Sequence, residues 1–268
     1  MTGRFAPSPT GPLHLGSLVA ALGSWLFARR AGGRWLVRME DLDAPRVVPG
    51  SAEEILEALR RYELHWDGEV VFQSRRTALY DAAIDVLRSK NLVYDCGCSR
   101  ADLQRAASAP VGAEPIYPGT CRNGLPPGKI ARAIRFRASD DVIAFDDQLC
   151  GRVEAKADDF IVRRADGVFA YQLAVVVDDA AQGVTQVVRG RDLLASTPRQ
   201  IALQRALGYA TPQYAHLPLV TNADGSKLGK RDGALPLPSL DRERIAATKE
   251  WALRFIEERG PETPQSGC

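Results

Sequence analysis

The N-terminal stretch of the sequence decides the fold: residues 3–17 read Gly-Arg-Phe-Ala-Pro-Ser-Pro-Thr-Gly-Pro-Leu-His-Leu-Gly-Ser. The first four predict a short strand, and the prolines after them favour an extended connection, because proline fixes φ and disfavours helix in the residue before it. From about Gly16 apolar residues recur at helical spacing. His14 and Ser17 therefore lie where a strand gives way to a helix N-terminus, and the free N–H groups there favour an anion such as a phosphate.

A second stretch supports the phosphate interpretation. Residues 225–233, Gly-Ser-Lys-Leu-Gly-Lys-Arg-Asp-Gly, place two lysines and an arginine on a glycine-rich loop, which can bring positive charge onto a triphosphate. Within the first stretch, Gly16 would let a flat base or a backbone come close. Each stretch alone has a plainer explanation: an ordinary histidine at position 14, and a solvated basic turn downstream.

Composition narrows the class of protein. The 268 residues suffice for one α/β core with a small module, and 45% hydrophobic and 25% charged residues are typical of a globular protein. The formal charge of +2 requires any nucleic-acid contact to come from local patches. No apolar run approaches the roughly 20 residues of a membrane span, and no signal peptide precedes the first strand. We therefore expect a cytoplasmic protein without membrane association.

Alternating strands and helices predict an α/β fold with a Rossmann-like, doubly wound parallel sheet. Strands are expected at 34–40, 92–94, 131–138, 143–155 and 184–189, and helices at 51–62, 77–90, 198–207 and 242–259. Ser51 and Glu54 predict a capping box at the second helix, and residues 160–171 predict a hairpin around Asp166-Gly167. No Gly-x-Gly-x-x-Gly supports an NAD site.

Three further side chains are candidates for holding a small charged ligand. Glu40 ends a predicted buried strand, where ligands of open α/β sheets bind, and can pair with an ammonium group. Tyr171 and Arg189, which we place near other strand ends, can hold a carboxylate through a phenolic donor and a charged fork. The plainer alternatives are a solvated acidic turn, half-buried packing and a surface ion pair.

Three of the five cysteines cluster in one segment. Three thiolates can ligate zinc, and a nearby tyrosine could supply an oxygen as fourth ligand. The alternative is a set of free cysteines in a loop, but a segment so poor in large apolar residues needs a staple to fold. We therefore expect one structural zinc ion on Cys96, Cys98, Tyr117 and Cys121.

The two charged stretches, in this order and separation, resemble the two ATP motifs of class I aminoacyl-tRNA synthetases, and residues 4–11 resemble the glutamyl branch. With the cysteine segment, the chain is similar to the glutamyl-queuosine tRNA(Asp) synthetases, which lack an anticodon-binding domain. The resemblance covers residues 4–233. It implies ATP-dependent, tRNA-independent activation of L-glutamate to glutamyl-adenylate, and transfer of glutamate to queuosine in the anticodon loop of tRNA(Asp). The alternatives are a truncated glutamyl-tRNA synthetase acting on a tRNA 3′ end and a catalytically silent RNA-binding paralogue.

The resemblance also implies roles for individual residues. The glutamate site falls on Arg4, Phe5, Ala6, Pro7, Ser8, Glu40, Tyr171 and Arg189, and the ATP site on His14, Gly16, Ser17, Lys227 and Lys230. His14 and Lys230 would be the catalytic residues, acting on the phosphates of ATP with Mg²⁺. Two positions depart from the family pattern: Ser17 stands where the general motif has histidine, and Gly229 replaces the usual serine.

We expect four segments in a monomeric chain. Residues 1–94 and 166–240 would form the two halves of the catalytic domain, the second carrying the basic ATP loop. Residues 95–165 would form an inserted α+β, zinc-binding subdomain of the acceptor-binding type, and residues 241–268 a C-terminal helix and tail.

Overall fold

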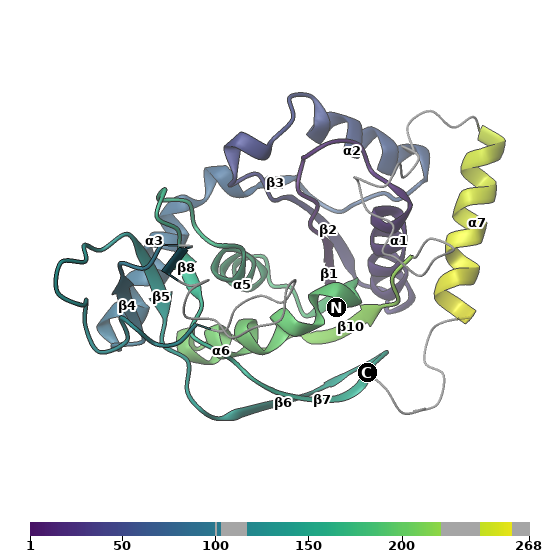
Figure 1. The fold of residues 1–268 in the computed structure, drawn as a ribbon. Coiled ribbons are helices and arrows are strands. Elements are labelled where there is room, and N and C mark those ends of the chain that lie inside the picture. Colours follow the sequence, from purple (N-terminus) through teal and green to yellow (C-terminus); the bar gives the residue numbers. More distant parts are fainter. Residues whose placement is uncertain (100, 103–116, 221–241, 259–268) are drawn as a thin grey trace.

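The computed structural model describes residues 1–99, 101–102, 117–220 and 242–258 (Figure 1). Its α-helices are α1 (Leu15–Arg30), α2 (Ser51–Arg61), α3 (Thr77–Ser89), α5 (Tyr171–Ala181), α6 (Thr197–Leu207) and α7 (Arg242–Glu258). Its strands are β1 (Thr2–Phe5), β2 (Arg34–Met39), β3 (Val71–Phe72), β4 (Val93–Cys96), β5 (Ala133–Phe136), β6 (Val142–Asp147), β7 (Gly151–Lys156), β8 (Ile161–Arg163), β9 (Gln186–Gly190) and β10 (Gln213–Leu217). Three short 3₁₀ helices, η1 (Ala44–Arg46), η2 (Gln73–Arg75) and η3 (Arg191–Ser196), connect them.

Parallel strands form the centre of the molecule. One sheet has the order β1-β2-β3 and a second the order β7-β6-β10-β9, with parallel pairing throughout except between β6 and β7. The two sheets meet where β9 lies beside β1, and the Thr185 N–H donates to the Thr2 carbonyl there at 2.9 Å. The strand order reverses at this meeting point, which in open α/β sheets opens a crevice at the carboxyl ends of the strands.

Side chains alternate between two cores on the two faces of this sheet. On β9, Val187 joins one buried cluster with α3, α5 and α6, while the adjacent Val188 joins the other with α1 and α2. On β10, Tyr214 and Ala215 divide in the same way. Figure 1 shows α1 and α5 on opposite sides of β1 and β2. Helices therefore cover both faces of the parallel strands, which explains why these strands are apolar on both sides.

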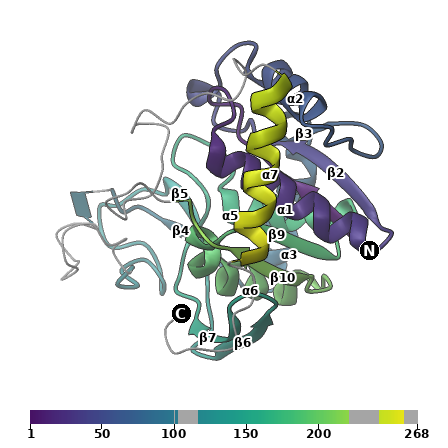
Figure 2. The same cartoon turned by 90° about the vertical axis from the view of Figure 1, so that its right-hand side faces the viewer.

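The remaining strands, β4-β5-β8, form a separate antiparallel sheet. After β8, Arg164 N–H donates to the Val168 carbonyl at 2.8 Å, and Arg163 bridges Phe169, so the predicted hairpin around Asp166-Gly167 is confirmed. The helix at the C-terminal end, α7, lies beside α1 (Figure 2). Its buried Ala252 and Ile256 belong to the same apolar cluster as the buried residues of α1. No helix in the described part of the chain is both long and apolar enough to cross a membrane.

Three local predictions were wrong. Ser51 does not cap α2: Gly50, with φ of 79°, precedes the helix, and the Ser51 hydroxyl bonds the distant Gly11 instead. Residues 143–155 form two strands rather than one, because the Asp147 carboxylate accepts the N–H groups of Leu149 and Cys150 and so closes a turn. Tyr171 is the first residue of α5 and not a strand-end residue.

Candidate active site

Two adjoining cavities occupy the crevice where the strand order reverses. The larger, about 590 Å³, lies along the loop from β1 to α1 and the end of β10. The smaller, about 130 Å³, lies between the ends of β1, β2 and β9 and the start of α5. Both are lined by Phe5, Ala6, Ala20, Gly190 and Leu193, so their walls are shared. This arrangement can hold two small molecules in contact with each other.

The larger cavity contains the predicted anion site. His14, Gly16 and Ser17 line it, and His14 is the N-terminal cap of α1. His14 Nδ1 accepts the Ser17 N–H at 3.2 Å, and His14 Nε2 lies 3.0 Å from Ser17 Oγ. An accepting Nδ1 places the proton of the neutral ring on Nε2, which then donates to Ser17 Oγ, so the Ser17 hydroxyl proton is turned away from the ring beside a helix N-terminus. A Cβ on Gly16 would lie 3.2 Å from the imidazole, so glycine there leaves room for the ring.

The loop that forms this cavity is fixed from both sides. The Ser51 hydroxyl donates to the Gly11 carbonyl at 2.8 Å and accepts the Gly11 N–H at 3.0 Å. Gly11 has φ of 125°, a conformation that other residues rarely adopt. The Glu40 N–H donates to the Pro7 carbonyl at 2.9 Å, which ties the loop to the end of β2. The walls of the two cavities are thereby held by backbone geometry.

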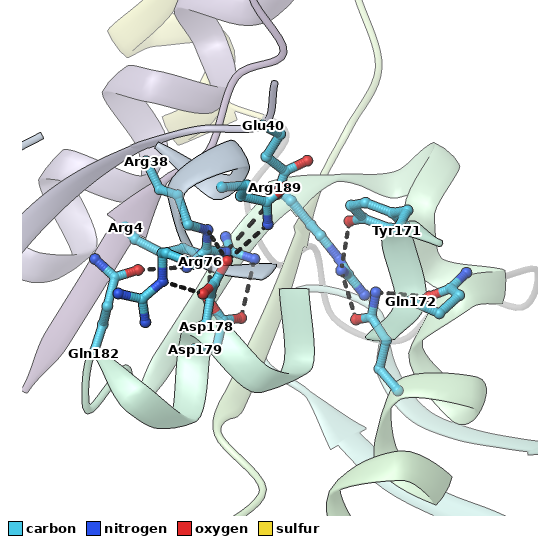
Figure 3. A network of polar contacts seen from close by, with 12 residues as sticks. Arg4, Arg38, Glu40, Arg76, Tyr171, Gln172, Asp178, Asp179, Gln182 and Arg189 are labelled. Carbon is cyan, nitrogen blue, oxygen red and sulfur yellow. Dashed lines mark hydrogen bonds and ion pairs between the residues drawn. The ribbon is translucent and has the colours of Figure 1, made fainter. Parts of the chain in front are cut away.

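The smaller cavity gathers four charged or phenolic side chains that lie far apart in the sequence. Arg4 comes from β1, Glu40 from the end of β2, Tyr171 from α5 and Arg189 from β9 (Figure 3). The other predicted glutamate-site residues divide between the cavities: Phe5 and Ala6 line both, while Pro7 and Ser8 line the larger. The site therefore presents an acid, a phenol and two guanidinium groups to one small volume.

Glu40 is the acidic member of this group. Its side chain is 11% exposed and lies 3.8 Å from Arg38, too far for a hydrogen bond. Burial raises the pKa of Glu40 to about 7, although the positive charges of Arg38 and Arg4 lower it. A cationic ligand beside this carboxyl group would lower its pKa again and so favour the charged carboxylate.

Arg4 belongs to a buried ion network that sequence reasoning missed. Arg4 Nε contacts Asp179 Oδ1 at 3.2 Å, and the fully buried Arg38 donates to the same oxygen at 2.8 Å. Burial alone would raise the pKa of Asp179, but the two arginines outweigh it and the pKa is lowered. Asp178 beside it accepts from Arg76 at 2.5 Å (Figure 3). It also accepts from Gln73 at 2.9 Å and from Tyr80 at 2.7 Å. The signal in the sequence is the acidic pair that ends the apolar run of α5.

Arg189 has an acceptor for each of its five N–H groups. Nε donates to His216 Nε2 at 3.0 Å, Nη1 to Tyr171 Oη at 3.3 Å and to Gln200 Oε1 at 2.8 Å. Nη2 donates to Thr197 Oγ1 at 2.8 Å and to the Leu193 carbonyl at 3.4 Å. Arg189 is therefore fixed from all sides and contacts Tyr171 inside the smaller cavity.

A third group of predicted residues lies apart from these cavities, between β4 and β5. The sulfur atoms of Cys96, Cys98 and Cys121 lie within 4.8 Å of one another, and Cys98 and Cys121 are 3.6 Å apart. The Tyr117 hydroxyl lies 3.6 Å from Cys96 and 3.8 Å from Cys98. A tetrahedral zinc site with Zn–S bonds of about 2.3 Å has edges of about 3.8 Å, so these donors fit zinc.

The surroundings of this cysteine cluster favour a negative sulfur. Arg135, itself buried, donates to Cys96 Sγ at 3.3 Å and stacks on the Tyr117 ring at 3.8 Å. Burial would raise the pKa of Cys96, but the hydrogen bonds from Arg135 and from the Cys98 N–H lower it overall. The pKa of Cys98 is raised to about 11 by burial and by the neighbouring thiols. A metal ion would relieve this crowding of sulfur atoms.

The basic loop predicted to contact ATP lies outside the described residues, so the positions of Lys227, Gly229 and Lys230 stay predictions. One exposed cation in the described part of the chain was not predicted: Arg46, at the end of η1, lines the larger cavity. It follows the acidic cluster at the end of β2 by a few residues, which is the signal that could have found it.

The fold is that of a class I tRNA synthetase. The family model described as "tRNA synthetases class I (E and Q), catalytic domain" matches residues 1–265. A solved glutamate tRNA ligase from Elizabethkingia meningosepticum, in complex with its amino acid, superposes with a TM-score of 0.76 at 32% identity. The match covers 87% of this chain and 52% of that one, so the chain spans about half of its length.

Curated relatives narrow the family further. The glutamyl-Q tRNA(Asp) synthetase of Geobacter sulfurreducens is 59% identical over 97% of this chain and 85% of its own length. That of Thiobacillus denitrificans is 58% identical over 91% of this chain and 82% of its own length. The chain belongs to the glutamyl-Q tRNA(Asp) synthetase family of class I tRNA synthetases.

Proposed function

We propose that this protein activates L-glutamate with ATP in the absence of tRNA and transfers the glutamyl group to queuosine in the anticodon loop of tRNA(Asp). The observation that carries the proposal is the pair of adjoining cavities, one lined by Glu40, Tyr171 and two arginines, the other built on the N-terminus of α1. The proposed identity of the substrates rests on family membership, with relatives at 58% and 59% identity.

In this proposal the smaller cavity binds glutamate. The Glu40 carboxylate pairs with the α-ammonium group, which returns the carboxyl to its charged form. Arg4 uses Nε and one N–H of Nη2 on Asp179 and one N–H of Nη1 on the Val188 carbonyl. Among the described residues, one N–H on each terminal nitrogen of Arg4 is thus left for a substrate carboxylate. Arg189, with all five N–H groups engaged, acts through the Tyr171 hydroxyl.

ATP enters the larger cavity as its magnesium complex. An oxygen of the glutamate α-carboxylate attacks the α-phosphorus in line, and pyrophosphate leaves with the electrons of the broken P–O bond. The N–H groups at the start of α1 stabilise the phosphate charge, and we assign the same role to Lys230 and to His14, whose Nε2–H bonds Ser17 Oγ in this structure and would turn to a phosphate oxygen when ATP binds. Gly190, which lines both cavities, lets the two substrates come into contact.

The second step attaches glutamate to the modified base. A hydroxyl on the cyclopentene ring of queuosine attacks the carbonyl carbon of the adenylate, and AMP leaves. For the inserted segment we propose one structural zinc ion on Cys96, Cys98, Tyr117 and Cys121, because the donor atoms match a closed tetrahedral site. With all four positions taken by protein ligands, such an ion would have no part in the chemistry and would serve to order the segment.

Exchange of labelled pyrophosphate into ATP, measured with glutamate and without tRNA, tests the first step. We expect exchange that depends on glutamate, and its absence would favour a catalytically silent paralogue. Glutamylation of tRNA(Asp) with and without queuosine tests the second step. Glutamylation of queuosine-free tRNA would show a glutamyl-tRNA synthetase acting on the 3′ end and would refute the proposed acceptor.

A further inference from the structure

We propose that Asp147 and His216 are positioning residues of the glutamate site, which hold Arg189 and, through it, the Tyr171 hydroxyl. The inference rests on the proposed function and extends it to two residues that line neither cavity. His216 Nδ1 lies 2.6 Å from Asp147 Oδ2, and His216 Nε2 accepts from Arg189 Nε at 3.0 Å. The three side chains thus form one chain of hydrogen bonds that ends at Arg189, in the wall of the smaller cavity.

The sheet places these residues in register. Arg189 on β9 and His216 on β10 are direct partners in the parallel ladder, and Asp147 ends β6 on the other side of β10. The side chains of Asp147 and His216 have no exposed surface, and Arg189 is 5% exposed. Three adjacent strands therefore fix this chain of hydrogen bonds, and its three side chains are buried away from solvent.

The direction of the hydrogen bonds follows from the donors available. Arg189 can only donate, so His216 Nε2 carries no proton and the ring is the Nδ1–H tautomer. Asp147 is then the acceptor at Nδ1. Burial raises the pKa of Asp147, but hydrogen bonds from His216 and the Cys150 N–H hold it at about 2, and burial lowers the pKa of His216. A neutral imidazole therefore joins a carboxylate to a guanidinium.

The same hydrogen bonds determine whether the Tyr171 hydroxyl can donate to the substrate. Because Arg189 Nη1 donates to Tyr171 Oη, the phenol accepts on that side and its own proton is free to point into the smaller cavity. Gln200 takes the second Nη1 proton at 2.8 Å and is itself held by Gln172 at 2.9 Å. His216 is the partner of Arg189 Nε, so a change in the His216 ring acts directly on the position of Arg189.

Asp147→Asn tests the inference with a nearly isosteric change. Asp147 Oδ1 accepts the N–H groups of Leu149, Cys150 and His216 at 2.9 to 3.1 Å, so the amide oxygen stays there and the NH₂ group faces His216 Nδ1. That donor forces the proton of His216 onto Nε2, where it opposes Arg189 Nε–H. We expect the KM for glutamate in pyrophosphate exchange to rise about tenfold to a hundredfold, and the KM for ATP to change less than about twofold.

Two comparisons separate positioning from a merely structural effect. Asp146→Asn, next in sequence and 79% exposed in its side chain, is the matched control and should leave both KM values unchanged. His216→Gln keeps an acceptor at the Nε2 position and should keep a glutamate KM closer to wild type than Asp147→Asn does. Nitrogen-15 NMR of the histidine ring should show the Nδ1–H tautomer in the wild type and the Nε2–H tautomer in Asp147→Asn.

The outcomes are distinct. A wild type without glutamate-dependent exchange refutes the proposed function and this inference with it. An active wild type whose Asp147→Asn variant keeps its glutamate KM refutes the inference alone. Equal rises in both KM values, with an unchanged tautomer, would also overturn it, because they indicate general damage to the sheet.

Discussion

Burial of the Glu40 carboxylate lowers the free energy of unfolding at neutral pH, and this loss can be measured. Its pKa of about 7 lies above the ordinary value of 4.5 because burial disfavours the charged carboxylate. The folded protein therefore binds this proton more tightly than the unfolded chain does. The contribution of Glu40 to stability is full below pH 4.5 and is lost as the pH rises through 7.

Glu40→Gln removes the titration and keeps the shape of the side chain. A pKa displaced from 4.5 to about 7 corresponds to about 3 kcal/mol, at about 1.36 kcal/mol per tenfold change in proton affinity. Relative to the wild type, the variant should gain free energy of unfolding as pH rises between 4.5 and 7, by up to about 3 kcal/mol, and gain no more above that range. It should also lose most of the glutamate-dependent exchange, because the neutral amide cannot form an ion pair with an ammonium group.

Urea unfolding at pH 5, 6, 7 and 8, without ligands, measures this difference. The wild type, Glu40→Gln and Glu69→Gln are compared at each pH, since Glu69 is an exposed carboxylate on the same half of the chain. The difference between Glu40→Gln and wild type should grow by about 2 to 3 kcal/mol from pH 5 to pH 8, and that for Glu69→Gln should stay within about 0.5 kcal/mol.

A difference for Glu40→Gln that is flat across this pH range would refute the reasoning. It would mean that water or a neighbouring cation already solvates the carboxylate, so that no charge is held in reserve for the substrate. A variant that is less stable than wild type at pH 8 would refute it as well, since the buried charge would then be net stabilising.

Three further predictions concern other parts of the chain. Lys230→Ala should slow adenylate formation much more than it weakens glutamate binding, because its charge is used as pyrophosphate develops; single-turnover rates and calorimetric glutamate binding compare the two losses. Cys98→Ser should lose the zinc, about one per chain in the wild type by metal analysis, and impair tRNA use while largely sparing tRNA-independent exchange. Gly23→Ala should lower the free energy of unfolding by about 1 to 3 kcal/mol in denaturant titrations, despite alanine's higher helix propensity. Its Cβ would lie 2.5 Å from the buried Leu217 side chain.

Much of the architecture follows from local sequence. Proline and glycine after β1 forbid helix until Leu15, and Gly208, with φ of 76°, ends α6 where the sequence predicts. Buried strands such as β2 stand out as short apolar runs between turn residues. These signals act within a few residues, so they can be recognised without knowledge of the fold.

Two of the wrong local predictions, for Ser51 and Tyr171, share one physical cause. The Ser51 hydroxyl can cap its own helix or bond a distant backbone, and the choice depends on Gly11 being within 3 Å. Tyr171 lies in an apolar run that strand and helix accommodate equally well, and packing of α5 against α3 and α6 decides for helix. Where local preferences are balanced, long-range contacts decide the outcome.

In the candidate site, too, some features follow from the local sequence and others from long-range contacts. The sequence by itself predicted the residues of the anion site, because His14, Gly16 and Ser17 lie within four positions at one helix N-terminus. It also singled out Glu40 and Arg189, but without the contacts that set their chemistry. Only the tertiary structure decided that burial raises the pKa of Glu40 and that His216 holds Arg189, since both depend on side chains brought together from separate strands. Charge and hydrogen bonding act through space over a few ångströms, and the sheet, not the sequence order, sets those distances.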